Sequence, residues 1–145
     1  MQNPARYAAP VGRILLALIF IASAFGKFAD WQMPLKMMAD KDVPSPEVLL
    51  PIAVALELGG GLLVAAGFYA RVGGLMLLLF LVPVSYFMHD FWNYEDAGQR
   101  MEQMINFMKN VAIMGGALLV VAFGSGVCSI DHWRAKPSAS EHPAK

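Results

Sequence analysis

The stretch 104-MINFMKNVAIMGGALLVVAFGSGVCSID-131 decides the fold of this chain. After Lys109 it holds no charged residue until Asp131, a run of about twenty residues that is long enough for a helix to cross the hydrocarbon core of a bilayer. The predicted helix therefore begins with a lysine inside its apolar part. Such a lysine must either extend its stem to the membrane surface or pair with an anion. The rest of the sequence can be searched for that anion.

The composition agrees with a membrane protein. Of the 145 residues, 57% are hydrophobic and only 15% are charged, whereas soluble domains carry about 25% charged residues. The formal net charge is zero, so nothing indicates a nucleic-acid partner. The single cysteine cannot form a disulfide within the chain and has no partner spacing typical of zinc or an iron–sulfur cluster. We therefore predict no metal site.

Three further apolar segments precede the quoted stretch. They predict helices over Tyr7–Phe28, Val48–Tyr69 and Val72–Met88. A polar connection with three prolines over residues 30–47 and a polar one over 89–103 predict two solvent-side loops. The fold class is thus all-α, an integral membrane four-helix bundle over residues 1–131, with a polar tail over 132–145 that we expect to be disordered. The first segment resembles a signal peptide, but the apolar run continues beyond the cleavage-like Ala22-Ser23-Ala24, so we expect it to be retained.

Charge outside the spans predicts the orientation. The side that holds both termini carries five basic residues and the other side carries three; these are Arg6, Arg71, Arg134, Lys136 and Lys145 against Lys36, Lys41 and Arg100. The positive-inside rule then places both termini in the cytoplasm. Arg13 and Lys27 lie near the ends of the first helix, where we expect their stems to reach the membrane surface.

Glu57 is the predicted anion. If its helix starts near Val48, the carboxylate lies about 13 Å below the entry point, too deep for a short side chain to reach water. The glycines at 59–61 follow directly and should let a neighbouring helix approach closely.

The polar residues within the spans fall in one half of the membrane. They are Lys27, Glu57, His89, Asn106, Lys109 and Asn110. We predict a polar pocket in that half, near the periplasmic surface, with Glu57 paired to Lys109 or Lys27 and the remaining groups completing the hydrogen bonds. The alternative is that these polar groups only tie helices together. A metal bound by Glu57, His89 and Asp90 is not favoured, because no ExxH helix motif accompanies them.

Several blocks of the sequence resemble the DoxX family. The first is G-R-x-L-L-A-L-I-F-I-A-S-A-F-x-K-F over residues 12–28, and the second is a glutamate with glycines and G-F-x-x-R over 57–71. The third is N-F-x-K-N followed by G-x-G-x-x-S-x-D, ending at Asp131, and it is especially similar to YphA-like bacterial inner-membrane members. The resemblance implies a multi-pass protein of the bacterial inner membrane. In this resemblance, the polar pattern of the family is matched by Glu57, Arg71, Asn106, Lys109 and Asn110.

Some members of this family are associated with quinone-linked oxidation of thiosulfate or with membrane complexes that detoxify oxidants and thiols. Our first hypothesis is therefore a small quinone-interacting or redox-associated subunit, in which Lys109 and Asn110 bind a quinone oxygen and Glu57 or His89 exchanges its proton. The second is a non-catalytic adaptor for a partner oxidoreductase, and the third is a small-molecule permease that would need to form a homo-oligomer. The sequence shows no flavin, nicotinamide or haem motif and leaves open whether the chain is an enzyme.

Overall fold

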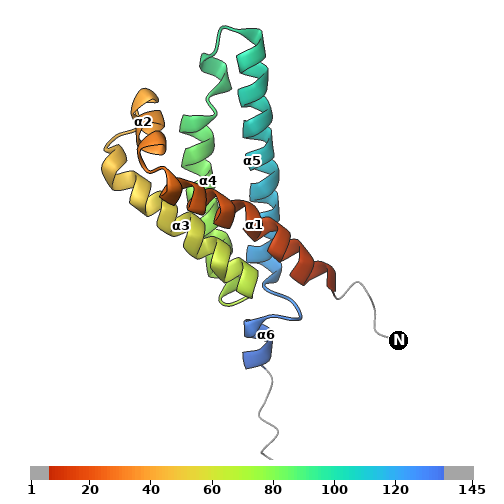
Figure 1. Ribbon diagram of the computed structural model, residues 1–145. Coiled ribbons are helices and arrows are strands. Elements are labelled where there is room, and N and C mark those ends of the chain that lie inside the picture. Colours follow the sequence, from red (N-terminus) through yellow and green to blue (C-terminus); the bar gives the residue numbers. More distant parts are fainter. Residues whose placement is uncertain (1–6, 136–145) are drawn as a thin grey trace, which may run out of the picture.

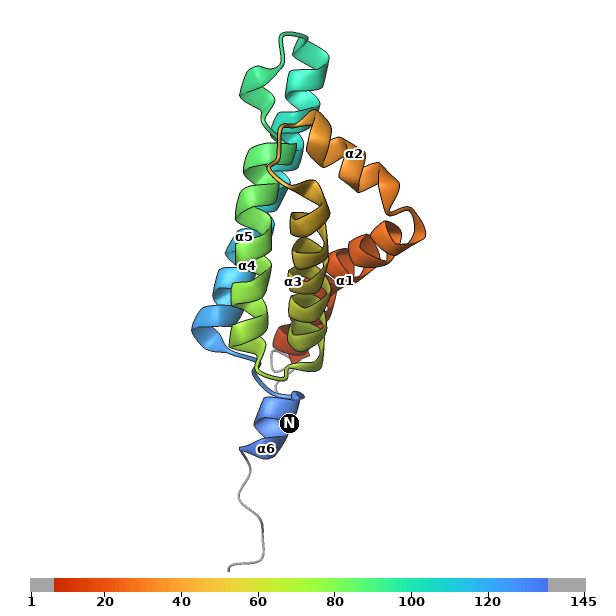
Figure 2. The same ribbon diagram turned by 90° about the vertical axis from the view of Figure 1, so that its left-hand side faces the viewer.

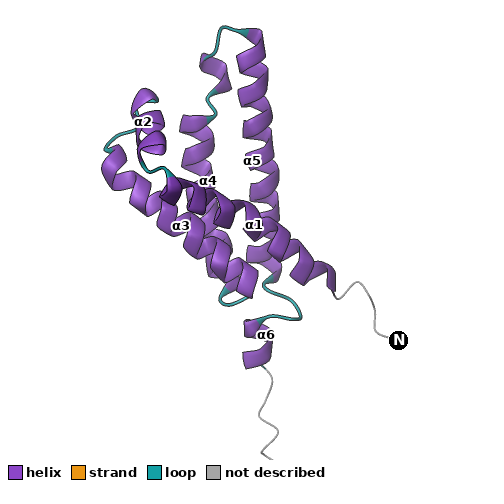
Figure 3. Cartoon of the chain, in the orientation of Figure 1, coloured by secondary structure: helices purple, strands orange, loops and turns teal. Residues whose placement is uncertain are grey.

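The computed structural model describes residues 7–135, and Figure 3 shows that this part of the chain is helical, with no strand. Four helices are long and apolar enough to cross a membrane. They are α1 (Ala8–Ala29), α3 (Pro46–Ala66), α4 (Ala70–Met88) and α5 (Ala97–Phe123). The shorter elements are α2 (Gln32–Asp40), the 3₁₀ turn η2 (Phe91–Asn93) and α6 (Ile130–Arg134). The predicted all-α class and the four spans are confirmed.

The long helices pack in the order α1, α3, α4, α5, with α1 also touching α5. The start of α1, the α3–α4 turn and α6 lie at one end of the bundle, which we call the terminal end (Figure 1). The end that carries α2, η2 and the start of α5 is called the distal end. The described chain begins and ends at the terminal end, which agrees with the predicted even number of crossings. The placement of the terminal end in the cytoplasm stays a prediction.

Glycines set the spacing of the helices. A Cβ atom on Gly60 of α3 would lie 3.0 Å from the Gly73 carbonyl oxygen of α4, and one on Gly73 would lie 2.9 Å from the Gly60 carbonyl oxygen. A Cβ atom on Gly61 would lie 3.2 Å from Ile21 Cγ1 of α1. The absence of side chains therefore brings α3 close to both neighbours, as the run of three glycines predicts.

The connection between the first two spans differs from the prediction, because residues 32–40 form α2 rather than a loop. Proline is tolerated in a first helical turn, and Pro34 is the third residue of α2. The Asp30 carboxylate accepts a hydrogen bond from the Met33 amide (3.1 Å), which supports that turn. Leu35 and Met38 then share a face that packs on an apolar cluster of α1 and α3. α1, α2 and α3 form the three sides of a triangle in Figure 2.

The last span ends earlier in the sequence than the charge-free run predicts. α5 ends at Phe123, because Gly124 and Gly126 adopt left-handed backbone conformations that continue no helix. The chain then turns back across the terminal end and forms α6, which includes the first residues of the predicted tail. Residues 136–145 lie outside the described part of the chain.

Candidate functional site

An ion pair joins α1 to α3 inside the helix bundle. Lys27 Nζ lies 2.7 Å from Glu57 Oε2 and donates a second hydrogen bond, also 2.7 Å long, to Ser23 Oγ one turn earlier in α1. The ammonium also lies 5.6 Å from the centre of the Phe80 ring of α4. Glu57 is 1% exposed. The carboxylate is therefore held away from water, whereas the Lys27 side chain is 21% exposed, and each charge has the other as its counter-ion.

Apolar clusters surround this pair. One cluster contains Ala24, Leu50 and Val54, where α1 and α3 meet α2. The other contains Phe20 and Leu77 and joins the four long helices. Because these clusters exclude water, the attraction between the two charges is stronger than at a protein surface, but the cost of leaving either charge without a partner is also greater.

The ion pair lines a cavity of about 510 Å³, and residues of all four spans and of α2 contribute to its wall. Its polar lining consists of Ser23, Lys27, Glu57, His89 and Asn110, and the other lining residues are apolar. Small-molecule sites are commonly apolar pockets of about 300–1,000 Å³ with a few polar groups that orient the ligand. The cavity has both features.

His89, the residue that ends α4, is oriented by α5. Its Nδ1 lies 2.9 Å from Gln103 Oε1, and in the tautomer that donates to this oxygen Nε2 is left as an acceptor. Asn110 of α5 is half-buried on the same cavity. The pocket predicted from Glu57, Lys27, His89 and Asn110 is thus assembled, while their role in ligand binding stays a prediction.

Asn106 and Lys109 do not reach this cavity. Lys109 is exposed and donates a 3.4 Å hydrogen bond to Asn106 Oδ1 on its own helix. The prediction that Glu57 pairs with Lys109 is wrong, and the alternative partner, Lys27, is confirmed. The physical reason is the packing order, because α3 contacts α1 and α4 but is separated from α5 by α4.

Arg13 is the polar residue whose role sequence reasoning missed. It does not extend to the surface but is 4% exposed, and its Nη2 donates a 3.0 Å hydrogen bond to the Cys128 carbonyl oxygen. The space it occupies exists because Gly67 has no side chain, and a Cβ atom there would collide with the guanidinium. The sequence signal for the burial of Arg13 was Gly67, the glycine of the G-F-x-x-R block, which lies 54 residues after it.

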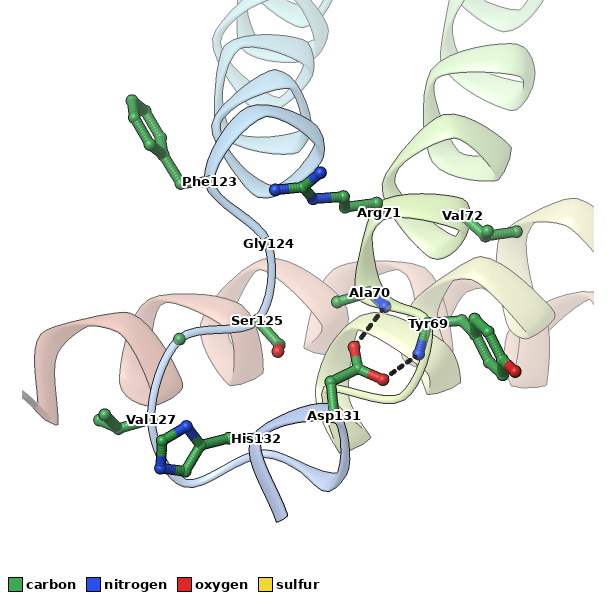
Figure 4. A pocket seen from close by; sticks show the side chains of 11 residues that line it. Tyr69, Ala70, Arg71, Val72, Phe123, Gly124, Ser125, Val127, Asp131 and His132 are labelled. Atoms are coloured by element: carbon green, nitrogen blue, oxygen red, sulfur yellow. Dashed lines mark hydrogen bonds between the residues drawn. The ribbon is translucent and has the colours of Figure 1, made fainter. Parts of the chain in front are cut away.

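Asp131 ties the terminal end together (Figure 4). Its two carboxylate oxygens accept hydrogen bonds from the Tyr69 amide (2.9 Å) and the Ala70 amide (3.2 Å) at the start of α4. Its own amide donates to the Gly67 carbonyl oxygen (2.9 Å). The carboxylate thus satisfies amides that a helix start leaves without partners and complements the helix dipole. The S-x-D part of the last sequence block is therefore structural here.

Comparison with known proteins identifies the family. The DoxX family model matches residues 8–90, more than half of the chain. The Escherichia coli inner membrane proteins YphA and YqjF are 31% and 33% identical to it, over 83% of this chain and 86% and 87% of theirs. The yeast ER-derived vesicles protein ERV29 is 29% identical over 83% of this chain but only 31% of its own length. No solved structure matches. The chain belongs to the DoxX family.

Proposed function

Since the chain is a multi-pass inner-membrane protein of the DoxX family, we propose that it is a quinone-interacting subunit whose cavity holds the head group of a membrane quinone. One observation carries this proposal. The buried Lys27–Glu57 pair opens, together with His89 and Asn110, onto a cavity that is otherwise apolar and lies between membrane spans.

The chemistry of the lining suits a neutral ring with hydrogen-bonding oxygens. The Lys27 ammonium donates to a quinone carbonyl oxygen, and the Glu57 carboxylate accepts from a quinol hydroxyl. On the α4 and α5 walls, His89 Nε2 accepts and the Asn110 amide both donates and accepts. Because the ion pair has no net charge, the cavity favours a neutral ligand over an anion or a cation.

The proposed role in redox chemistry is to bind the quinol and take up its protons. Oxidation of a quinol to a quinone releases two protons and two electrons. Glu57 accepts one proton from the nearer hydroxyl and His89 Nε2 accepts the other, while the electrons pass to the redox centre of a partner oxidoreductase.

Quinone titration of the purified protein tests the proposal. We expect Glu57→Gln and Lys27→Met each to weaken binding of a short-chain quinone about tenfold, the effect of losing one charge-assisted hydrogen bond in a buried site. Lys109→Met is the matched control, because it removes a lysine of similar depth that does not line the cavity. Unchanged affinity in both cavity variants, in protein shown to be folded, would contradict the proposal.

A second candidate is a non-catalytic adaptor, and the exposed face of α5 favours it. Only 11% of the apolar part of this helix is buried, the least of the four spans, and Lys109 is exposed on it, with its ammonium bonded to Asn106 of the same helix. The adaptor hypothesis expects an oxidoreductase to co-purify with the wild type and to be lost with Lys109→Met. Co-purification of no redox partner would count against it.

A further inference from the structure

We propose that a hollow at the terminal end binds the phosphate group of an anionic phospholipid. The hollow measures about 660 Å³ and lies between the start of α4 and the segment that joins α5 to α6 (Figure 4). Arg71 and His132 line it together with Val72, Phe123 and Asp131. It lies at the opposite end of the bundle from α2 and belongs to no part of the proposed quinone site.

Within residues 7–135, the charge of Arg71 has no counter-ion. Its side chain is exposed, and its single hydrogen bond is a long one (3.4 Å) from Nη2 to the Ala122 carbonyl oxygen. Over residues 7–135 it forms no ion pair. A guanidinium carries five N–H donors in a planar fork that matches two oxygens of a phosphate. Most of that binding capacity is therefore available to a ligand.

Asp131 does not cancel this charge. Both of its oxygens accept amide hydrogen bonds from the start of α4, and the carboxylate acts electrostatically on the buried Arg13. Arg134 lines a second hollow beside α6 and lies 5.5 Å from the centres of the Phe68 and Tyr69 rings. In the described residues, the terminal end thus carries Arg13, Arg71 and Arg134 against one carboxylate, Asp131.

The distal end has the opposite charge. The connection over residues 30–47 holds four acidic and two basic residues, and the one over 89–103 holds four acidic and one basic. Anionic lipid should therefore be repelled there and attracted at the terminal end. This contrast supplies an internal control for any lipid-binding experiment.

The apolar lining favours a lipid over free phosphate. Phe123 is 79% exposed at the end of α5, and Val72 is exposed in the first turn of α4. Both side chains line the same hollow as Arg71. A phosphodiester bound by Arg71 would place its glycerol and acyl chains against these residues, whereas inorganic phosphate would leave them without a contact. Basic pockets between spans at a membrane surface bind lipid head groups in this way.

Native mass spectrometry of the full chain with equal amounts of phosphatidylglycerol and phosphatidylcholine tests the inference. We expect phosphatidylglycerol to be retained preferentially and Arg71→Gln to lower its retention about tenfold. Arg100→Gln, which removes an exposed arginine at the distal end, should leave retention unchanged. If Arg71→Gln does not fold, Arg71→Lys keeps the charge but loses the paired hydrogen bonds, and retention should fall by a smaller factor.

Two results would overturn the inference. The first is equal retention of phosphatidylglycerol by Arg71→Gln or Arg71→Lys and the wild type, or an equal fall with Arg100→Gln. The second is binding of inorganic phosphate as tight as that of phosphatidylglycerol, which would make the hollow a site for a free anion. Neither result bears on quinone binding, because Arg71 does not line the cavity at the Lys27–Glu57 pair.

Discussion

Arg13 and Lys27 are two cations on the same helix, about four turns apart, and the difference between them separates a structural site from a candidate binding site. Both are turned inward. Arg13 fills a space closed by Gly67 and the segment that follows α5, and its Nε and Nη1 are buried without a partner in the described part of the chain. Lys27 faces a carboxylate and a cavity of about 510 Å³.

The comparison teaches that burial of a charge does not by itself indicate ligand binding. At Arg13 the one hydrogen-bond partner in the described part of the chain is a backbone carbonyl, that of Cys128, and the side chain does not line the cavity. At Lys27 the counter-ion is a side chain that can exchange its partner, and the adjoining space is large enough for a ligand. An accessible cavity beside a charge that can change partners is what distinguishes the second site.

The largest effect is expected from removing the counter-ion of Lys27. Glu57→Ala leaves a buried ammonium unpaired and should lower the free energy of unfolding by about 3–5 kcal/mol, measured by chemical unfolding in detergent. The double variant Lys27→Met/Glu57→Leu removes both charges and should recover most of that loss. If the double variant is as unstable as Glu57→Ala, the cost does not come from an unpaired charge.

A smaller loss is expected at the other end of α1, where Asp131 balances Arg13 and supports the start of α4. Asp131→Ala removes two charge-assisted hydrogen bonds from the Tyr69 and Ala70 amides and should cost about 1.5–3 kcal/mol. Quinone binding should be unaffected, because Asp131 does not line the cavity at the Lys27–Glu57 pair. The control is Glu102→Gln, at an exposed position of α5. A lowered quinone affinity in folded Asp131→Ala would show that the two ends are coupled.

Gly67→Ala tests whether Arg13 occupies a closed space. Gly67 has φ +63°, and a Cβ atom there would meet the guanidinium. We expect the loss in the free energy of unfolding to exceed the roughly 1–2 kcal/mol that the left-handed backbone alone costs. Gly115→Ala is the matched control, because nothing lies near its position and helix propensity predicts a small gain. A loss no larger than the roughly 1–2 kcal/mol of the left-handed backbone would mean that Arg13 can move aside.

The extent of each span could be predicted from the sequence, but rotation about the helix axis could not. The rise per residue predicts similar depths for Glu57 and Lys109, yet α4 lies between their helices. The inward turn of Arg13 depends on Gly67 and Cys128, which are distant in sequence. The spacing of Leu35 and Met38 did hold a signal for α2, which the surrounding prolines and charges obscured.

The smallest effect is expected at Lys41, which pairs with Asp90 at the distal end, where water has access. Partial burial lowers the pKa of Lys41, but its hydrogen bonds to Asp90 and to the Tyr94 hydroxyl outweigh this and raise its pKa above the ordinary value. Because the pKa is higher in the folded state, this stabilisation is fully present below about pH 10.4 and is lost as the pH rises through the folded pKa. Lys41→Met should therefore cost at most about 1 kcal/mol at pH 8 and should flatten the decline in stability at alkaline pH. If the stability of Lys41→Met declines as steeply with rising pH as that of the wild type, the decline comes from another titratable group. The Lys41–Asp90 pair would then have no measurable role in stability.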